Sequence, residues 1–438
     1  MRLICIACLF LSMNLFGQGN LTYTSVDSIS YVQYIQNDYK GLKNVVKNAE
    51  KQGVDFLYMH TRFGIVAFNQ GKFVESTPQF EAAYAMSPND TIIQEYLYYS
   101  YLYNDQAEQA RALVLTFNES LQKKVGFSNH SLDQFALSIG PSFSNNYSKN
   151  GASIYLGPGI SNVETLNNRS FFREGIYTKH TLGQRFQLYN SLSMFQLKST
   201  GIIQFPGMKT TETKDYSSNY FQYNIGLGYQ SNNNWLFSGG FGAYRSTLNW
   251  YTYHLNPSSM RVLTTETTNY TNFSGSLTVG KRLKYFYPTA SFHVSSFLNS
   301  TQTQEELNLT VYPLGNNNLF TTASFSNIND TESHQVYGLR AGGMLGKSVL
   351  LDGEVAFGNL ANRITSNGFS TYNSMDKITL NTGVNIHVFS KKRLEYVFSY
   401  YFQQKTGQAY QYTSTTAYNL KDYTYNVNNL IFTLKWNF

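Results

Sequence analysis

The sequence predicts a membrane-spanning antiparallel β-barrel of about 14 strands, with 16 as the alternative, preceded by an all-α domain. Three observations lead to this prediction. Charged residues are scarce while aromatic residues are frequent, apolar and polar residues alternate over most of the chain, and the connections between the alternating segments are in turn short and long. We therefore assign 1–17 to a signal peptide, 24–124 to the helical domain and 127–438 to the barrel.

The composition suits a wall between lipid and water. Charged residues are 13% of the 438 residues, about half of the share in a soluble domain, and aromatic residues are 16%. Mean hydropathy is nevertheless −0.33, because Asn, Ser, Thr, Gln and Gly replace the missing charge. The net charge of +7 is dispersed, with only short basic clusters such as 391–393. We therefore expect no nucleic-acid partner.

Residues 1–17 have the features of a secretory signal peptide: one arginine, an apolar run and a small residue before the expected cleavage point. The run is too short to cross a membrane as a helix. Cys5 and Cys8 lie inside it, so the mature chain is expected to contain no disulfide. Lipidation of one of these cysteines is the alternative.

The segment 24–124 has helical periodicity and resembles the tetratricopeptide repeat. Small, aromatic and turn residues of that family's pattern are Gly64, Gly71, Phe73, Phe80, Ala83 and Pro88. Shifts of 34 residues place further core residues in register, which predicts three helical hairpins. The departures are Ser76, where the family usually has Ala, and Pro78 within the second helix of the hairpin.

The resemblance implies a peptide-binding groove lined by the first helix of each hairpin. On this sequence it assigns to the groove Tyr58, Thr61, Ile65, Phe68, Tyr99 and Tyr103. Tyrosine offers a large contact area at a low entropic cost. The alternative is that several of these side chains pack against neighbouring helices or the barrel.

From 127 onward the period is two, as in β-strands. In "YFQYNIGLGYQ" one face is apolar and the other consists of Gln, Asn and Gly. A small, amide-rich opposite face is typical of a water-filled barrel lumen. After a first strand in 132–144, further strands are expected to begin near Phe172, Phe186, Asn219, Trp235, Thr271, Tyr285, Glu306, Leu319, His334, Val349, Lys377, Leu394 and Asn428.

The loops indicate the orientation. Short connections such as "LGQRF" alternate with long ones such as "NPSSMRVLTTETTN", and bacterial barrels have short periplasmic turns and long external loops. Both ends of the barrel should then be periplasmic, which requires an even number of strands. The segment "GASIYLGPGIS" is left over, and it would be an external hairpin arm, part of a long first strand, or one of two extra strands in a barrel of 16.

The end of the chain resembles the terminal strand of outer-membrane barrels, whose last aromatic residue is recognised by the barrel-assembly machinery. The resemblance implies a Gram-negative outer membrane and that machinery as a partner during biogenesis. The residues that carry it alternate along one face: Leu430, Phe432, Leu434, Trp436 and Phe438.

Five charged residues fall on the predicted lumen face: Asp133, Arg340, Asp352, Glu354 and Glu395. They predict a charge cluster that lines or closes a pore. Mutual pairing that fills the lumen, or a wrong assignment of the face, are the alternatives. The seven histidines show no metal-ligand spacing and no catalytic motif is present, so we expect no cofactor, no metal and no enzyme, although a dispersed barrel active site is an alternative.

In architecture the chain resembles two-part outer-membrane proteins, such as the surface-lipoprotein assembly modifiers and YaiO-like barrels, in the style of Bacteroidota. The main hypothesis is that periplasmic helices bind a periplasmic or outer-membrane protein partner or client, while the lipid-embedded barrel anchors it or assists its export or assembly. The alternative is a passive or gated channel for small solutes with a periplasmic docking domain.

Overall fold

The computed structural model describes most of the chain, including the helices and strands named below. The described residues are 21–144, 163–204, 212–231, 233–255, 261–297, 300–365, 370–371, 376–391, 393–412 and 418–438. The predicted signal peptide at 1–17 and the left-over segment at 151–161 lie outside them. The chain divides into two compact units between Ser128 and Asn129.

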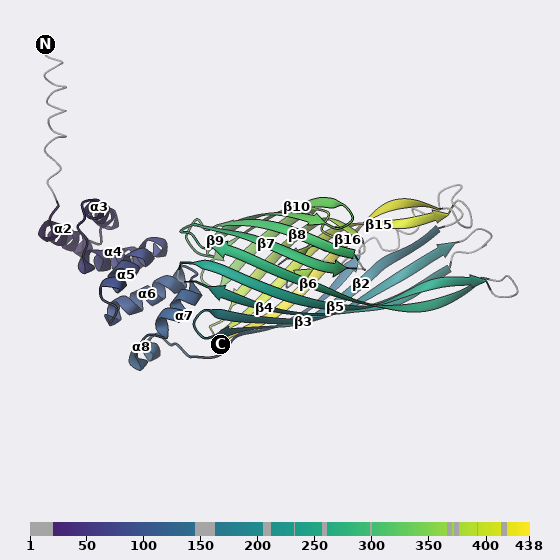
Figure 1. Cartoon of the computed structure of the whole chain (residues 1–438), viewed down its shortest axis with the longest axis horizontal. Helices are drawn as coiled ribbons and strands as arrows, with labels where there is room; N and C mark the ends of the chain where they lie inside the picture. Colours follow the sequence, from purple (N-terminus) through teal and green to yellow (C-terminus); the bar gives the residue numbers. More distant parts are fainter. Residues whose placement is uncertain are drawn as a thin grey trace, which may run out of the picture. The chain divides into compact units, whose positions relative to one another are not determined.

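The first unit contains seven helices among the described residues, and each is labelled in Figure 1. They are α2 (Tyr23–Ile35), α3 (Tyr39–Lys51), α4 (Leu57–Asn69), α5 (Phe73–Met86), α6 (Thr91–Tyr103), α7 (Ala107–Val114) and α8 (Glu119–Lys124). None of these helices is both long enough and apolar enough to cross a membrane.

Local sequence signals explain where these helices begin and touch. The side chain of Asp38 accepts a hydrogen bond from the backbone of Gly41, and Asp90 caps α6 in the same way. Gly64 lets α4 and α5 approach closely, because a Cβ there would lie 2.8 Å from the ring of Phe80. Ser76, which departs from the repeat pattern, is fully buried and lies 3.1 Å from the hydroxyl of Ser100.

The second unit is a closed antiparallel barrel of 14 strands, which confirms the predicted fold. Successive strands are neighbours (Figure 1), β11 pairs with β14, and β16 pairs with β1 to close the barrel. The strands are β1 (Leu132–Ser144), β2 (Val163–Leu182), β3 (Phe186–Gln204), β4 (Glu212–Gln230), β5 (Trp235–Leu255), β6 (Arg261–Lys281), β7 (Phe286–Phe297), β8 (Ser300–Val311), β9 (Leu319–Asn329), β10 (Ser333–Leu345), β11 (Val349–Gly358), β14 (Lys377–Phe389), β15 (Leu394–Tyr412) and β16 (Tyr418–Asn437).

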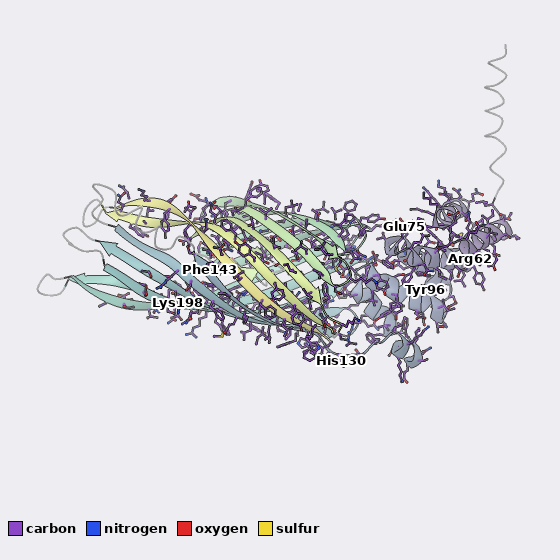
Figure 2. All side chains as sticks on the ribbon, turned by 180° about the vertical axis from the view of Figure 1, so that it is seen from behind. Arg62, Glu75, Tyr96, His130, Phe143 and Lys198 are labelled. Atoms are coloured by element: carbon purple, nitrogen blue, oxygen red, sulfur yellow. The ribbon has the colours of Figure 1, made fainter. Side chains whose placement is uncertain are left out.

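The alternation of residues separates the two faces of this wall. Large apolar side chains such as Leu277, Leu307 and Phe241 are exposed on the outside, and the side chains that cover the wall are drawn in Figure 2. Polar side chains such as Asn224 and Asn381 point inward and are buried. Since every backbone group within a closed barrel is paired, such a wall can stand in lipid.

Several strands are longer than predicted. β2 to β6, β15 and β16 each have 19 to 21 residues, whereas about 9–11 suffice to cross a bilayer. The predicted long loops after β3, β5 and β15 are therefore largely strand. At the same end of the barrel, the connections after β7 and β9 are short, at 298–299 and 330–332.

One long connection follows β11. It contains a small separate sheet, in which β12 (Ile364–Thr365) pairs with β13 (Ser370–Thr371). Gly358 ends β11 with a φ of 124°, and a Cβ there would lie 2.3 Å from the backbone oxygen of Gln335. Only glycine suits both the conformation and the contact.

Candidate functional site

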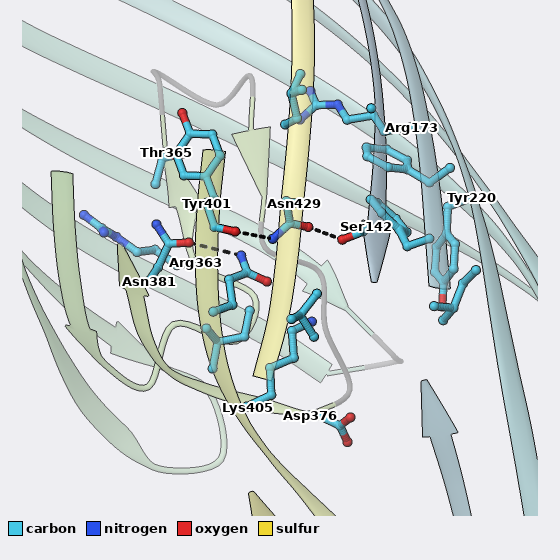
Figure 3. A pocket seen from close by; sticks show the side chains of 18 of the residues that line it. Ser142, Arg173, Tyr220, Arg363, Thr365, Asp376, Asn381, Tyr401, Lys405 and Asn429 are labelled. Atoms are coloured by element: carbon cyan, nitrogen blue, oxygen red, sulfur yellow. Dashed lines mark hydrogen bonds between the residues drawn. The ribbon is translucent and has the colours of Figure 1, made fainter. Parts of the chain in front are cut away.

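The barrel encloses a cavity of about 1990 Å³ that is lined by inward-facing side chains from nearly every strand. Figure 3 shows part of its wall, where Ser142, Tyr401 and Asn429 come from three neighbouring strands. The hydroxyl of Ser142 donates to the side-chain oxygen of Asn429, and the amide of Asn429 donates to the backbone oxygen of Tyr401 at 3.3 Å. Alternate residues of each strand face inward, and most of those that line the cavity are polar, such as Ser138 and Asn381.

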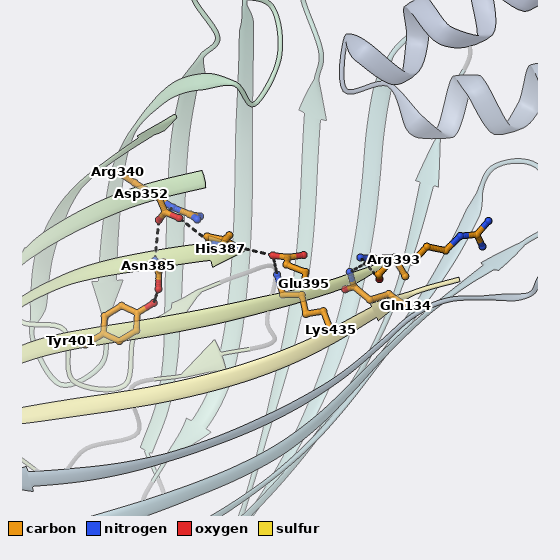
Figure 4. Close-up of polar contacts among 10 residues, drawn as sticks. Gln134, Arg340, Asp352, Asn385, His387, Arg393, Glu395, Tyr401 and Lys435 are labelled. Atoms are coloured by element: carbon orange, nitrogen blue, oxygen red, sulfur yellow. Dashed lines mark hydrogen bonds and ion pairs between the residues drawn. The ribbon is translucent and has the colours of Figure 1, made fainter. Parts of the chain in front are cut away.

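A row of charged side chains crosses the wall from β10 to β16 (Figure 4). The Arg340 guanidinium donates to Asp352 at 2.9 Å, and His387 lies 3.0 Å from Asp352 and 2.7 Å from Glu395. Lys435 donates to Glu395 at 2.9 Å. Both nitrogens of His387 face carboxylate oxygens, and only the doubly protonated ring offers two donors. The row therefore alternates in charge and is paired throughout.

Neutral residues complete this network. The amide of Asn385 donates to Asp352 at 2.9 Å, and the hydroxyl of Tyr401 donates to Asn385 at 2.9 Å. The amide of Asn381 donates to Glu354 at 3.2 Å. A fully hydrogen-bonded network of this kind holds its members rigidly.

Four of the five predicted lumen charges face the interior: Arg340, Asp352, Glu354 and Glu395. Asp133 lies apart from them, because it has the same parity along β1 as Leu137 and Ile139, which are exposed on the outer wall, and it stands at the register shift between Leu132 and Gln134. Its carboxylate accepts a hydrogen bond from Thr181.

A segment that we call the arm, Asn359–Thr365, extends from the end of β11 into the barrel. Two of its apolar side chains are completely buried. Leu360 packs with Ile328, Val336, Ala356 and Ile378, all from the barrel wall. Ile364 packs with Tyr244 and Phe297 from β5 and β7. Burying each such side chain stabilises the arm by about 1.5–3 kcal/mol.

Polar side chains of β8 bind the part of the arm from Asn362 to Ile364. The amide of Gln304 both donates to the backbone oxygen of Ile364 at 2.7 Å and accepts from its N–H at 2.9 Å. Gln302 donates to the backbone oxygen of Asn362 at 3.0 Å. The guanidinium of Arg363 donates to Glu306 at 3.1 Å, and both side chains are about nine-tenths buried.

The sequence analysis did not identify Arg363, Glu306 or His293 as site residues. Arg363 lies in a connection, where the period of two gives no inward direction. Glu306 was taken only as the beginning of a strand. A possible signal was the pair Arg363–Ile364 within a stretch otherwise rich in Asn, Ser and Gly.

The predicted groove residues lie on the helical unit in two places. Phe68, Tyr99 and Tyr103 belong to one aromatic cluster, in which Phe68 lies 5.8 Å and Tyr99 lies 6.2 Å from the ring of Tyr103. Ile65 packs against the core beside them. Tyr58 is exposed, and the Arg62 guanidinium lies over its ring, 5.7 Å from the ring centroid. Thr61 donates to the backbone of Leu57.

The end of the chain closes the barrel. Leu430 and Trp436 of β16 are exposed, as is Phe438 directly after it, and Phe432 and Leu434 share their face. The rings of Trp436 and Phe438 stack at 5.5 Å, and the N–H of Phe438 donates to the backbone oxygen of Asp133 at 2.9 Å. Recognition of this strand by assembly machinery stays a prediction.

No protein-family model and no curated protein matches the chain. Among solved structures, it is similar to the toluene transporter TodX of P. putida, with 9% identity over 75% of this chain and 94% of that chain and a TM-score of 0.46. The toluene transporter TbuX of Ralstonia pickettii has 10% identity over 71% of this chain and 90% of that chain, with a TM-score of 0.44. A Pseudomonas aeruginosa FadL homologue has 10% identity over 69% of this chain and 89% of that chain, with a TM-score of 0.42.

The main functional prediction was a partner-binding protein that assists export or assembly. The structure instead shows a closed barrel around a cavity of about 1990 Å³ that is lined mostly by polar side chains. That prediction is wrong, and the alternative of a channel agrees better with the lumen described above. The barrel itself is of the outer-membrane type, because it is closed, antiparallel and apolar on its outer wall.

Proposed function

We propose that this protein is an outer-membrane channel for small polar solutes. The observation that carries the proposal is the polar cavity of about 1990 Å³ inside a barrel with an apolar outer wall. This volume exceeds the roughly 300–1,000 Å³ of a typical ligand pocket, so a small solute would keep part of its hydration while inside.

Several charges of the lumen are paired with one another. Arg340, Lys435 and Arg363 each form an ion pair with a carboxylate of the wall. These pairs contribute little net field, whereas selective ion channels rely on rings of one charge. The polar lining and its hydrogen-bonded networks support passage rather than catalysis.

We further propose that the helical unit lies in the periplasm and consists of tetratricopeptide-like repeats. It is joined to β1 at the end of the barrel where β16 also ends and where β2 and β3 are connected by 183–185. Short turns of bacterial barrels are periplasmic. The close approach at Gly64 supports the repeat assignment.

Liposome swelling tests the channel function. Purified full-length protein in liposomes should admit glycerol faster than glucose, and glucose faster than a disaccharide. Ser138→Trp should slow this uptake because Ser138 lines the cavity. Leu137→Trp is the matched control, since Leu137 is exposed on the outer wall. Uptake no faster than in protein-free liposomes would refute the proposal.

A further inference from the structure

We propose that the arm is a gate of this channel and that protonation of His293 opens it. The inference rests on the proposed channel function and adds its regulation. It follows from how the arm is attached, from polar atoms left without partners beneath it, and from the position of His293 beside the arm's ion pair.

The arm is attached by separable contacts rather than by a strand ladder. Its backbone is bound by the side chains of Gln302 and Gln304, and its charge is held by Glu306. Glu306 is itself fixed, because its carboxylate also accepts from Ser326 at 2.9 Å and from Asn308 at 2.9 Å. The wall therefore keeps its form when the arm leaves.

The interface between arm and wall contains several buried polar atoms without a hydrogen-bond partner among the described residues. They are both ring nitrogens of His293, the hydroxyl of Ser295, the side-chain oxygens of Gln302 and Asn362, and Nε of Arg363. Each such atom costs about as much as a hydrogen bond elsewhere contributes. Water would satisfy these atoms once the arm moves, which offsets part of the stabilisation that the attached state gains from burying Leu360 and Ile364.

His293 is 1% exposed and is the titratable side chain at this interface that can gain a charge near neutral pH. From β6 it faces neutral Ser276 and from β8 neutral Gln304. The charged groups that act on it are Glu306 of β8 and Arg363 of the arm. Glu306 is already engaged by Arg363, so a protonated ring would have to compete with Arg363 for this carboxylate.

Protonation therefore favours the detached state. One proton from water in the lumen adds to the imidazole, and no other bond forms. The imidazolium repels Arg363 and competes for Glu306, whereas in the detached state water accepts from both ring nitrogens. By linkage, the ratio of open to closed channels should rise as the pH falls through the range in which histidine titrates, by up to about ten-fold per pH unit.

Single-channel recording tests the gate. Full-length protein in planar lipid bilayers should spend more time in a state of larger conductance at pH 4.5 than at pH 7.5. His293→Gln, which keeps a polar side chain that does not titrate, should lose this response. His130→Gln is the matched control, since residue 130 precedes β1.

A second pair of variants tests the ion pair. Glu306→Gln should increase the time in the larger state at pH 7.5. Glu305→Gln should not, because Glu305 is exposed on the opposite face of β8 and binds Asn327 and Asn329 there. If Glu306→Gln spends no more time in the larger state at pH 7.5 than the wild type does, the proposal is overturned. It is also overturned if the response to acid persists in His293→Gln, or if it is lost only in His387→Gln.

The outcomes separate the two proposals. Currents that do not depend on pH would overturn the gate and leave the channel standing. Absence of current in the wild type and in Glu306→Gln at every pH would refute the channel function itself.

Discussion

The charged row on the lumen wall should stabilise the barrel, and Asp352→Asn tests how much. The side chain of Asp352 is completely buried and accepts from Arg340 and Asn385, with His387 3.0 Å away. The amide keeps one acceptor oxygen of nearly the same shape but loses the charge, so two charge-assisted contacts weaken.

Each charge-assisted hydrogen bond contributes about 1.5–3 kcal/mol. The side chain of Arg340 is 46% exposed and can regain water, so the lower end applies and the free energy of unfolding should fall by about 3 kcal/mol. Urea unfolding of the barrel in lipid vesicles, followed by tryptophan fluorescence, measures this change.

Asp330→Asn is the matched control. Asp330 is exposed in the turn between β9 and β10 and accepts from the backbone of Glu332 through an oxygen that asparagine retains. A loss below about 1 kcal/mol for Asp352→Asn, within the range of an exposed pair, would refute the idea that the row stabilises the wall.

Three further predictions follow from single contacts. Gly358→Ala should disturb the entry to the arm, because a Cβ meets the backbone of Gln335 at 2.3 Å; single-channel conductance at pH 7.5 should rise, and an unchanged conductance would contradict this. Phe438→Ala should reduce the amount of folded barrel in cell membranes, read as heat-modifiable migration on gels, whereas Asn437→Ala should not if the aromatic ring is the signal. Tyr101→Phe should cost the helical unit about 1 kcal/mol through the lost 2.8 Å bond to Glu81. Burial and the Glu81 carboxylate hold the pKa of Tyr101 well above its usual range, so this loss should be equal at pH 6 and pH 9 by circular dichroism; a loss that vanishes at pH 9 would contradict it.

The alternation of residues was sufficient to predict the number and order of the strands. Where one face must meet lipid, as at Phe237 and Phe241, the period of two is unmistakable. The period of two no longer predicts a strand where the strand extends beyond the membrane. The first half of β6 reads "RVLTTETTNY", in which no lipid selects an apolar face, and it was therefore taken as a loop. The strand is formed there by pairing with β5 from Leu255 back to Ser246.

The site was predicted only where it belongs to regular strands. Asp352 and Glu395 could be placed on the inner face by counting residues. The arm could not, because Leu360 and Ile364 are buried by contacts with strands distant in the sequence, such as β9 and β5. A burial of this kind depends on the closed barrel and has no local periodicity.

The lengths of the strands explain why the arm arises after β11. β11 has 10 residues, about the number that a tilted strand needs to cross a bilayer, so it ends near the membrane surface. β3 and β5, with 19 and 21 residues, continue for about nine to eleven residues more, which is roughly 30 Å along the strand. A connection that begins at the far end of β3 or β5 would use most of its residues to return to the mouth of the lumen. The connection after β11 begins at the lumen mouth, and the conformation of Gly358 directs it away from the continuing strand direction. Short strands on one side of the barrel thus place the arm within reach of Glu306, where an ion pair can hold it.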